Sequence, residues 1–226
     1  MKIIPAKTPG IVKTLLPNFV WNVNTEDKTL YLTFDDGPTP EITPWVLEQL
    51  KAYNAKATFF CIGKNIESHS EIFQNVLEEG HVVANHTYDH LKGWKVKTTI
   101  YVNNIELCDS VMTFQIQNSK SQGLSTDTLK LFRPPYGKLK TKQSKTLQKL
   151  GYKIILWDVL SYDWDKSVSE QQCYNNVISA ANSGSIIVFH DSVKASRNLQ
   201  YTLPKVLEYY CEKGFQFKAL TKHNLA

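Results

Sequence analysis

Short apolar stretches and longer amphipathic stretches alternate along this sequence from about residue 28 onward. The apolar stretches are rich in β-branched and aromatic residues, as buried parallel strands are, and they cover residues 30–34, 57–62, 81–84, 131–133, 152–157, 185–189 and 214–217. The stretches between them have helical periodicity and cover residues 44–53, 71–79, 100–114, 142–150, 169–182 and 203–213. This alternation predicts an α/β fold with a parallel sheet, and seven such units suit a barrel with one strand fewer than the eightfold form.

A single domain accounts for the whole sequence. Its 226 residues contain no internal repeat and no low-complexity linker, and 42% hydrophobic residues is enough to fill one sizeable core. We expect the domain to span residues 28–220, with residues 1–27 as an N-terminal extension packing on the barrel and residues 221–226 as a C-terminal tail. The longest polar stretch, residues 115–127, is expected to be an insertion loop.

Charge and cysteine usage exclude several classes of protein. Lys and Arg number 26 against 21 Asp and Glu, but the excess is scattered, so we expect no nucleic-acid binding. The four cysteines lie far apart, which indicates neither a disulfide framework nor a thiolate zinc site. Pro and Lys residues interrupt the first apolar stretches, so neither an export signal nor a membrane span is predicted. The sequence as given predicts a cytoplasmic monomer, and an extracytoplasmic location remains open through a removed leader or a non-classical route.

Two adjacent carboxylates, Asp35 and Asp36, end the first predicted strand and precede a Gly-Pro turn. Like charges this close repel each other unless a cation holds one or a proton neutralises one, so a metal ligand beside a general base is a natural division of labour. The alternative is a turn in which one Asp caps the next helix.

The third predicted strand leads into two histidines four residues apart, His86 and His90. On a helical turn this spacing places both imidazoles on one face, where they can share a metal ion, although such pairs also occur on exposed helices. Two imidazoles and the carboxylate of Asp36 suit Zn²⁺ and leave a position open for water, and Co²⁺, Ni²⁺ or another divalent ion would also fit.

Three further segments carry candidate functional residues. In Arg133-Pro134-Pro135-Tyr136-Gly137 the prolines lack N–H groups, so the N–H of Tyr136 is the first free donor and could face a developing oxyanion. Residues 157–164 combine aromatics with carboxylates, and Trp164 is the expected wall of a sugar site. His190 follows a buried strand and can act as a general acid near neutral pH. Each segment also has a purely structural alternative. Residues 133–137 could be a surface turn, the aromatics of residues 157–164 could be core residues, and His190 could be a core histidine.

The positions of these residues favour a functional site. All of the unusual polar residues fall at or just beyond the carboxyl ends of predicted parallel strands, where barrel active sites assemble. They are Asp35, Asp36, His86, His90, Arg133, Asp163 and His190.

The segments TFDDGP, HTYDH, RPPYG, SYDW and VFH occur in this order between about residues 32 and 190. In this respect the chain resembles the NodB-type polysaccharide deacetylases, carbohydrate esterase family four. The resemblance implies a distorted (β/α)7 barrel and a metal-dependent enzyme that removes N-acetyl groups from chitin, chitooligosaccharides or peptidoglycan. In some members of the family the substrate is instead an O-acetylated xylan.

The resemblance also implies roles for individual residues. Asp36, His86 and His90 would bind the metal, Asp35 would be the general base, and His190 would protonate the leaving amine. Arg133 would position Asp35, Asp163 would orient Arg133 or His190, and the Tyr136 N–H would face the oxyanion. The acetyl methyl group would lie in a pocket lined by Trp164, Val188 and Pro134.

Two positions depart from the family pattern. Leu160 stands where the fourth motif commonly has Asp, and Val188 stands where the fifth commonly has Leu. These departures bear on the substrate preference and not on the reaction type. An O-acetyl esterase on the same scaffold is the nearest rival. A phosphatase with paired acidic residues around Mg²⁺ is disfavoured by the two histidines, and a non-catalytic carbohydrate-binding protein is disfavoured because Asp35 and His190 are both present.

Overall fold

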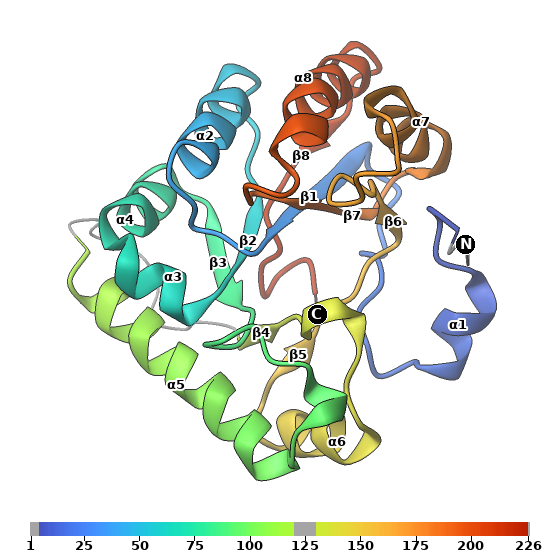
Figure 1. Ribbon diagram of the computed structural model, residues 1–226. Helices are drawn as coiled ribbons and strands as arrows, with labels where there is room; N and C mark the ends of the chain where they lie inside the picture. Colours follow the sequence, from blue (N-terminus) through green and yellow to red (C-terminus); the bar gives the residue numbers. More distant parts are fainter. Residues whose placement is uncertain (1–4, 120–129, 226) are drawn as a thin grey trace.

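The computed structural model describes residues 5–119 and 130–225, and a curled parallel sheet forms its centre (Figure 1). The strands are β1 (Thr29–Asp35), β2 (Thr58–Cys61), β3 (Val82–Asn85), β4 (Leu131–Phe132), β5 (Lys153–Ile154), β6 (Val159–Leu160), β7 (Ile186–His190) and β8 (Gln216–Phe217). Their order is β5-β4-β3-β2-β1-β7-β6, with β8 paired to the start of β1, and every pair is parallel. The predicted α/β class, distorted barrel and single domain are confirmed, and the barrel is an open, curled sheet.

Helices cover the outside of this sheet. They are α2 (Ile42–Ala52), α3 (Gly63–Ser68), α4 (Ser70–Glu78), α5 (Thr98–Gln117), α6 (Thr141–Lys149), α7 (Glu170–Ala180) and α8 (Ser196–Glu212), with the short helix α1 (Gly10–Leu15) before β1 and two 3-10 turns, η1 (Gly93–Lys95) and η2 (Pro135–Gly137). Within the described ranges, none of the helices combines the length and the apolar composition that crossing a membrane requires.

Strand β1 determines which side chains enter the barrel. All seven of its residues are buried, and side chains alternate between the two faces of a strand. Leu30, Leu32 and Phe34 pack under the helices in the main core, where the Phe34 ring stacks on Phe59 and Phe189. The alternate positions, Thr33 and Asp35 among them, therefore face the interior, and Asp35 reaches the carboxyl rim.

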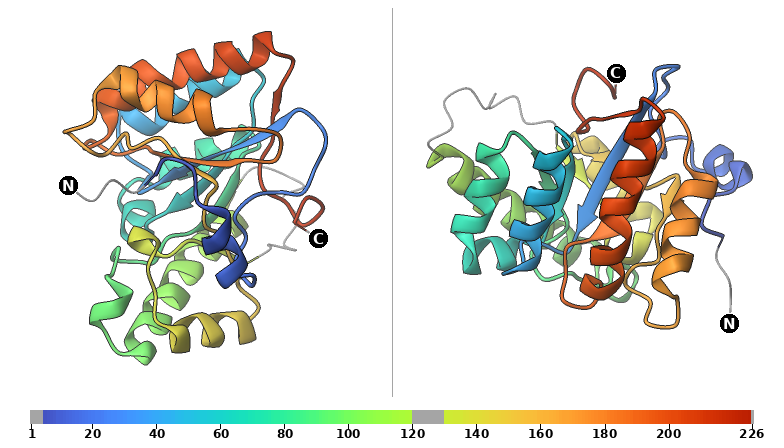
Figure 2. Two further views of the ribbon diagram at one scale, coloured as in Figure 1. Left: turned by 90° about the vertical axis from the view of Figure 1, so that its right-hand side faces the viewer. Right: turned by 90° about the horizontal axis from the view of Figure 1, so that it is seen from above.

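The sheet is open between β5 and β6, and the segment before β1 bridges this gap. Val20 forms a parallel bridge with Ile155, and Lys7 forms an antiparallel bridge with Val159. Figure 2 shows this segment, in dark blue, on the flank of the sheet. The chain before β1 thus supplies backbone hydrogen bonds to two strand edges that would otherwise lack partners.

A buried carboxylate fixes this segment to the sheet. Asp158 is 1% exposed, and its two oxygens lie 2.6 Å from the Nζ atoms of Lys7 and Lys13. Ser185 donates a further hydrogen bond of 2.5 Å to Asp158. Burial raises the pKa of Asp158, but the hydrogen bonds from Lys13, Lys7 and Ser185 outweigh this effect and hold the pKa below its ordinary value.

Several predicted element boundaries are wrong. Residues 159–160 lie outside every predicted strand but pair with β7, so residues 5–119 and 130–225 contain eight strands where seven were predicted. Helices α1 and α3 were not predicted either. Helix α8 begins at Ser196 rather than at residue 203, because Pro204 lies inside the helix instead of starting it. The expected loop at residues 115–127 begins inside α5, which ends at Gln117, and residues 120–129 lie outside the described residues.

We predict that replacing both Lys7 and Lys13 by Ala lowers the free energy of unfolding by about 1–2 kcal/mol. The double variant leaves the Asp158 carboxylate buried without a cation, but the lysine side chains are 40% and 24% exposed, so the loss is smaller than for a fully buried pair. Urea denaturation would measure the change, with exposed Lys51→Ala as the control. Equal midpoints for the double variant and the control would show that these ion pairs contribute no stability.

Candidate active site

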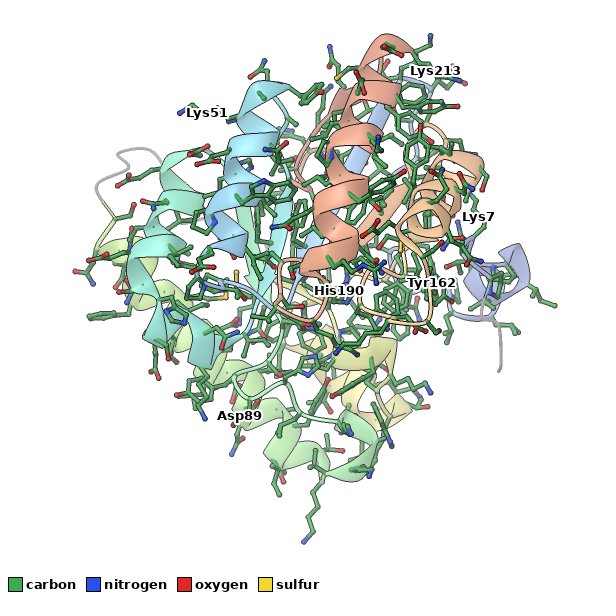
Figure 3. The ribbon with its side chains drawn as sticks, turned by 45° about the horizontal axis from the view of Figure 1, so that its top comes forward. Lys7, Lys51, Asp89, Tyr162, His190 and Lys213 are labelled. Atoms are coloured by element: carbon green, nitrogen blue, oxygen red, sulfur yellow. The ribbon has the colours of Figure 1, made fainter. Side chains whose placement is uncertain are left out.

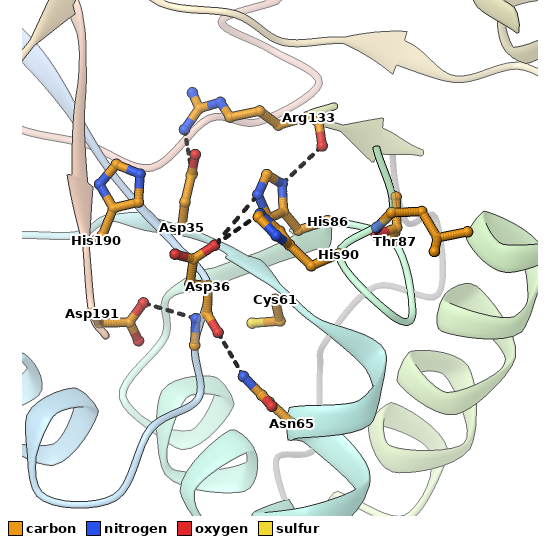
Figure 4. Close-up of polar contacts among 12 residues, drawn as sticks. Asp35, Asp36, Cys61, Asn65, His86, Thr87, His90, Arg133, His190 and Asp191 are labelled. Atoms are coloured by element: carbon orange, nitrogen blue, oxygen red, sulfur yellow. Dashed lines mark hydrogen bonds and ion pairs between the residues drawn. The ribbon is translucent and has the colours of Figure 1, made fainter. Parts of the chain in front are cut away.

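The carboxyl ends of the parallel strands bring most of the predicted site residues together. Asp35 ends β1 and pairs in register with His190 at the end of β7. Asp36, His86 and Arg133 each follow directly after β1, β3 and β4. Figure 3 shows His190 at this rim, and Figure 4 shows the polar side chains converging there.

Asp36, His86 and His90 form a cluster of potential metal ligands. The Nε2 atoms of His90 and His86 lie 3.3 Å and 3.6 Å from Oδ1 of Asp36, and one ligand atom from each residue lies within 4.8 Å of the others. Oδ1 of Asp36 is buried and has no hydrogen-bond partner among the described residues. Burying a carboxylate oxygen without a partner is costly, and a cation between it and the two imidazoles would remove this cost. The residues present therefore fit a divalent metal ion.

The two histidines lie on a loop, not on the helical turn that their spacing predicted. Thr87 and His90 have positive φ angles of 67° and 53°, which a helix does not allow. The loop is held by Asn85, whose side-chain oxygen accepts a hydrogen bond of 2.8 Å from the Thr87 N–H. This turn, rather than helical periodicity, brings both imidazoles to Asp36.

His86 is oriented for binding a metal through Nε2. Its Nδ1 lies 2.8 Å from the backbone oxygen of Arg133, and because a carbonyl can only accept, Nδ1 must carry the proton. The lone pair of Nε2 is then left facing Asp36. Burial lowers the pKa of His86 to about 4, so the imidazole is neutral at pH 7, as a metal ligand must be.

Asp35 forms a buried ion pair with Arg133. The distance from its Oδ1 to Arg133 Nη1 is 2.6 Å, and the same nitrogen donates to Thr33 Oγ1 at 2.7 Å. The guanidinium also donates to the backbone oxygens of Ile155 and Leu156. Burial raises the pKa of Asp35, but the charge and hydrogen bond of Arg133 and the charges of His86 and His190 together outweigh it. The net pKa is therefore lowered, and the group is ionised at neutral pH.

His190 is paired with Asp163. The distance from His190 Nδ1 to Asp163 Oδ1 is 2.9 Å, and the backbone N–H of His190 donates to Oδ2 of Asp163 at 2.7 Å. Burial lowers the pKa of His190, but the charge and hydrogen bond of Asp163 and the charges of Asp36 and Asp35 together outweigh it and raise the pKa to about 9. The sequence left open whether Asp163 orients Arg133 or His190, and in the structure its side chain contacts His190.

Aromatic side chains flank the polar centre. The Trp164 ring lies 4.7 Å from the His190 ring, and the Tyr136 ring lies 4.8 Å from the His90 ring. Val188 is buried on β7 in register with Thr33, so its side chain lies on the inner face. Pro134 is also buried, and Tyr136, at the centre of η2, has a φ of 61°.

Two polar residues that the sequence analysis left without a role hold the turn after β1. Asp191 Oδ1 accepts a hydrogen bond of 3.1 Å from the Gly37 N–H, and Asn65 donates one of 2.7 Å to the Asp36 carbonyl (Figure 4). A Cβ on Gly37 would lie 2.0 Å from Asp191, so only glycine fits at this position. Burial raises the pKa of Asp191 to about 7. Because Gly37 and Asp191 are 154 residues apart, no local pattern indicates this contact.

Together these residues form a candidate cation site with a carboxylate on one side and a histidine of raised pKa on the other. A family model described as "Polysaccharide deacetylase" matches residues 22–155 of the chain. The chain belongs to this family of hydrolases, which confirms the resemblance and the class of enzyme inferred from the sequence.

Two relatives and one solved structure illustrate the similarity. A peptidoglycan-N-acetylglucosamine deacetylase of Bacillus cereus is 38% identical over 84% of this chain, and the match covers 66% of that relative. A second Bacillus cereus protein of the same name is 32% identical, with 89% of this chain and 91% of the relative covered. The crystal structure of the Bc1960 peptidoglycan N-acetylglucosamine deacetylase matches with a TM-score of 0.82 and 31% identity, over 94% of this chain and 95% of that chain.

We predict that Asp36→Ala and His90→Ala each weaken the binding of Zn²⁺ and Co²⁺ by more than about 100-fold, because loss of a direct ligand should exceed the 10–100-fold effect of its supporting residues. Calorimetric titration and the absorption spectrum of bound Co²⁺ would measure this. Asp89→Ala is the matched control, since Asp89 is an exposed carboxylate on the same loop that accepts a hydrogen bond from Asn104. Wild-type Co²⁺ spectra in both ligand variants would place the metal elsewhere.

Proposed function

We propose that this protein is a metal-dependent deacetylase that removes N-acetyl groups from a glycan containing N-acetylglucosamine. The observation that carries the proposal is the cluster of Asp36, His86 and His90 with Asp35 and His190 beside it at one rim of the sheet. The names of the two Bacillus cereus relatives support the substrate class. The residues on this rim divide into ligands, a base, an acid and a pocket for the acetyl group.

The three ligands would hold a divalent cation, for which Zn²⁺ is the simplest candidate and Co²⁺ or Ni²⁺ are alternatives. Such a cation supplies a water of lowered pKa and polarises the acetyl carbonyl. The protein contributes a neutral imidazole at His86, whose proton is fixed on Nδ1. It also contributes the buried Oδ1 atom of Asp36.

Asp35 serves as the general base. Its carboxylate is ionised, since Arg133 holds its pKa low, and its Oδ1 atom is engaged by the guanidinium. The other oxygen is then left to accept a proton from the attacking water. Arg133 keeps the carboxylate in one orientation through a charge-assisted hydrogen bond.

His190 serves as the general acid. With a pKa raised to about 9 it is protonated at neutral pH, and Asp163 fixes its ring through Nδ1, so Nε2 carries the proton that is delivered. An amine leaving group must be protonated as the C–N bond breaks, whereas an ester with a good leaving group needs this less. A site with a firmly protonated His190 is therefore suited to amide hydrolysis.

The acetyl group would bind between Trp164, Val188 and Pro134, with its oxygen toward the backbone N–H of Tyr136. Val188 is a smaller residue than the leucine expected from the family pattern, so this pocket has more room than the pattern implies. Backbone N–H groups directed at a developing oxyanion stabilise the transition state more than the substrate.

We predict that Asp35→Asn reduces acetate release from N-acetylglucosamine oligomers by about 10²–10⁴-fold, the usual contribution of a general base. The substitution removes the proton acceptor but keeps the side-chain size and the ligand cluster. Acetate would be measured with and without a chelator, and bound metal would be measured in the same samples. Full activity of the variant on every substrate that the wild type hydrolyses would exclude Asp35 as the base.

We predict that Asp163→Asn moves the alkaline limb of the kcat/KM profile for amide substrates to lower pH by about one unit or more. The acid form of His190 is required, so activity is lost as the pH rises through its pKa, and that pKa is raised chiefly by Asp163. An aryl acetate serves as the reference substrate because its leaving group needs little protonation. An alkaline limb at the same pH in the variant would show that Asp163 does not determine the position of this limb. Equal dependence of ester and amide hydrolysis on His190 would favour the O-acetyl esterase.

A further inference from the structure

A second pair of aromatic side chains lies at the rim beside His90. Trp94 on η1 and Tyr136 on η2 have ring centroids 5.4 Å apart and planes at 82°, and Tyr136 in turn contacts His90. Trp94 is 37% exposed and Tyr136 is 50% exposed. Among the described residues Trp94 belongs to none of the hydrophobic clusters. The two rings, called here the Trp94–Tyr136 platform, thus form an exposed aromatic corner next to the ligand cluster.

The turn that carries Trp94 is held rigidly. The Gly93 carbonyl accepts a hydrogen bond of 2.8 Å from the buried side chain of Gln143, whose oxygen accepts the Lys140 N–H at 2.7 Å. A Cβ on Gly93 would lie 2.9 Å from the Tyr101 ring, so the turn packs directly on α5. A large apolar ring fixed in an exposed position suits the binding of a ligand more than the stability of the fold.

Two lysines extend over the platform. The Nζ atom of Lys92 lies 5.4 Å from the centre of the Tyr136 ring, and that of Lys138 lies 5.8 Å from the centre of the Trp94 ring. Both side chains are exposed, and neither forms an ion pair with any carboxylate in the part of the chain that the structure describes. Exposed cation–π contacts at this distance are weak, so both ammonium groups remain available to an anion.

We propose that the Trp94–Tyr136 platform, with Lys92 and Lys138, is a subsite for the sugar ring that adjoins the reacting N-acetylated ring, and that the ring bound there bears a carboxylate. The inference rests on the proposed function, because the ligand cluster beside Tyr136 fixes where the reacting ring lies. The apolar C–H face of a sugar stacks on an aromatic ring, and a carboxylate on that sugar gives the two lysines the partner they lack. A neutral glycan would use the rings and leave the charges unpaired.

Equilibrium binding tests the subsite separately from turnover. Two tetrasaccharides are compared by calorimetry in an Asp35→Asn background: the neutral N-acetylglucosamine tetramer, and a peptide-free peptidoglycan fragment with a lactyl carboxylate on alternate rings. We expect the carboxylate-bearing glycan to bind more tightly, by a margin that shrinks as salt is raised. Trp94→Ala should weaken the binding of both glycans by about tenfold.

The lysines are tested by a matched pair of double variants. The double variant Lys92→Ala with Lys138→Ala should bind the carboxylate-bearing glycan about three- to tenfold more weakly. It should also lose the preference for this glycan over the neutral tetramer. Lys51→Ala with Lys149→Ala removes the same charge from exposed positions on α2 and α6 and should preserve that preference.

The outcomes separate the two proposals. Equal affinity for the two glycans, or equal affinities in the two lysine double variants, would overturn the carboxylate assignment. Unchanged binding in Trp94→Ala would overturn the subsite, even if the wild type releases acetate from both glycans. Binding that depends on Trp94 and the lysines, with no acetate released by the wild type, would support the subsite and exclude the proposed deacetylation.

Discussion

The buried ion pair between Arg133 and Asp35 is the interaction on which the rest of the site depends. A fully buried guanidinium is costly to desolvate, and here its cost is offset by Asp35, Thr33 and two backbone carbonyls, with the Phe60 ring 4.0 Å below it. These partners come from β1, from β2 and from the segment after β5, so one side chain joins strands across the barrel interior. The Arg133 carbonyl also holds His86, and the same residue therefore positions the proposed base Asp35 and the proposed metal ligand His86.

The ligand cluster is formed against local backbone preference. Asp36, Thr87 and His90 all have positive φ angles, a conformation that costs free energy for residues other than glycine. Contacts from distant parts of the chain maintain it: Asn65 and Asp191 hold the turn after β1, and Asn85 holds the histidine loop. The arrangement also balances charge. Arg133 compensates the negative charge of the first of the two adjacent carboxylates, and a divalent cation would compensate that of the second.

The gap in the open sheet and its carboxyl rim carry different sets of contacts. The gap between β5 and β6 is bridged on its flank by the segment before β1, through backbone hydrogen bonds and the lysines bound to Asp158. The carboxyl rim carries an aromatic pair on each side, Tyr162 with Trp164 beside His190, and Trp94 with Tyr136 beside His90. Lys92 and Lys138 lie over the rings of the second pair, so a glycan bound as proposed would meet positive charge on that side.

The sequence by itself determined the parallel sheet, the rim and the residues on it. Buried parallel strands are recognisable in a sequence as apolar runs, and polar residues that follow such runs lie at one edge of the sheet. The sequence therefore predicted that Asp35, Asp36, His86 and His190 lie close together. Only the tertiary structure decided that the histidines lie on a loop and not on a helix, that residues 159–160 pair as a strand, and that Asp191 holds Gly37. It also decided that Trp94 stands beside Tyr136. These features depend on positive φ angles and on contacts between residues far apart in the chain. A local pattern of hydrophobicity predicts neither of them.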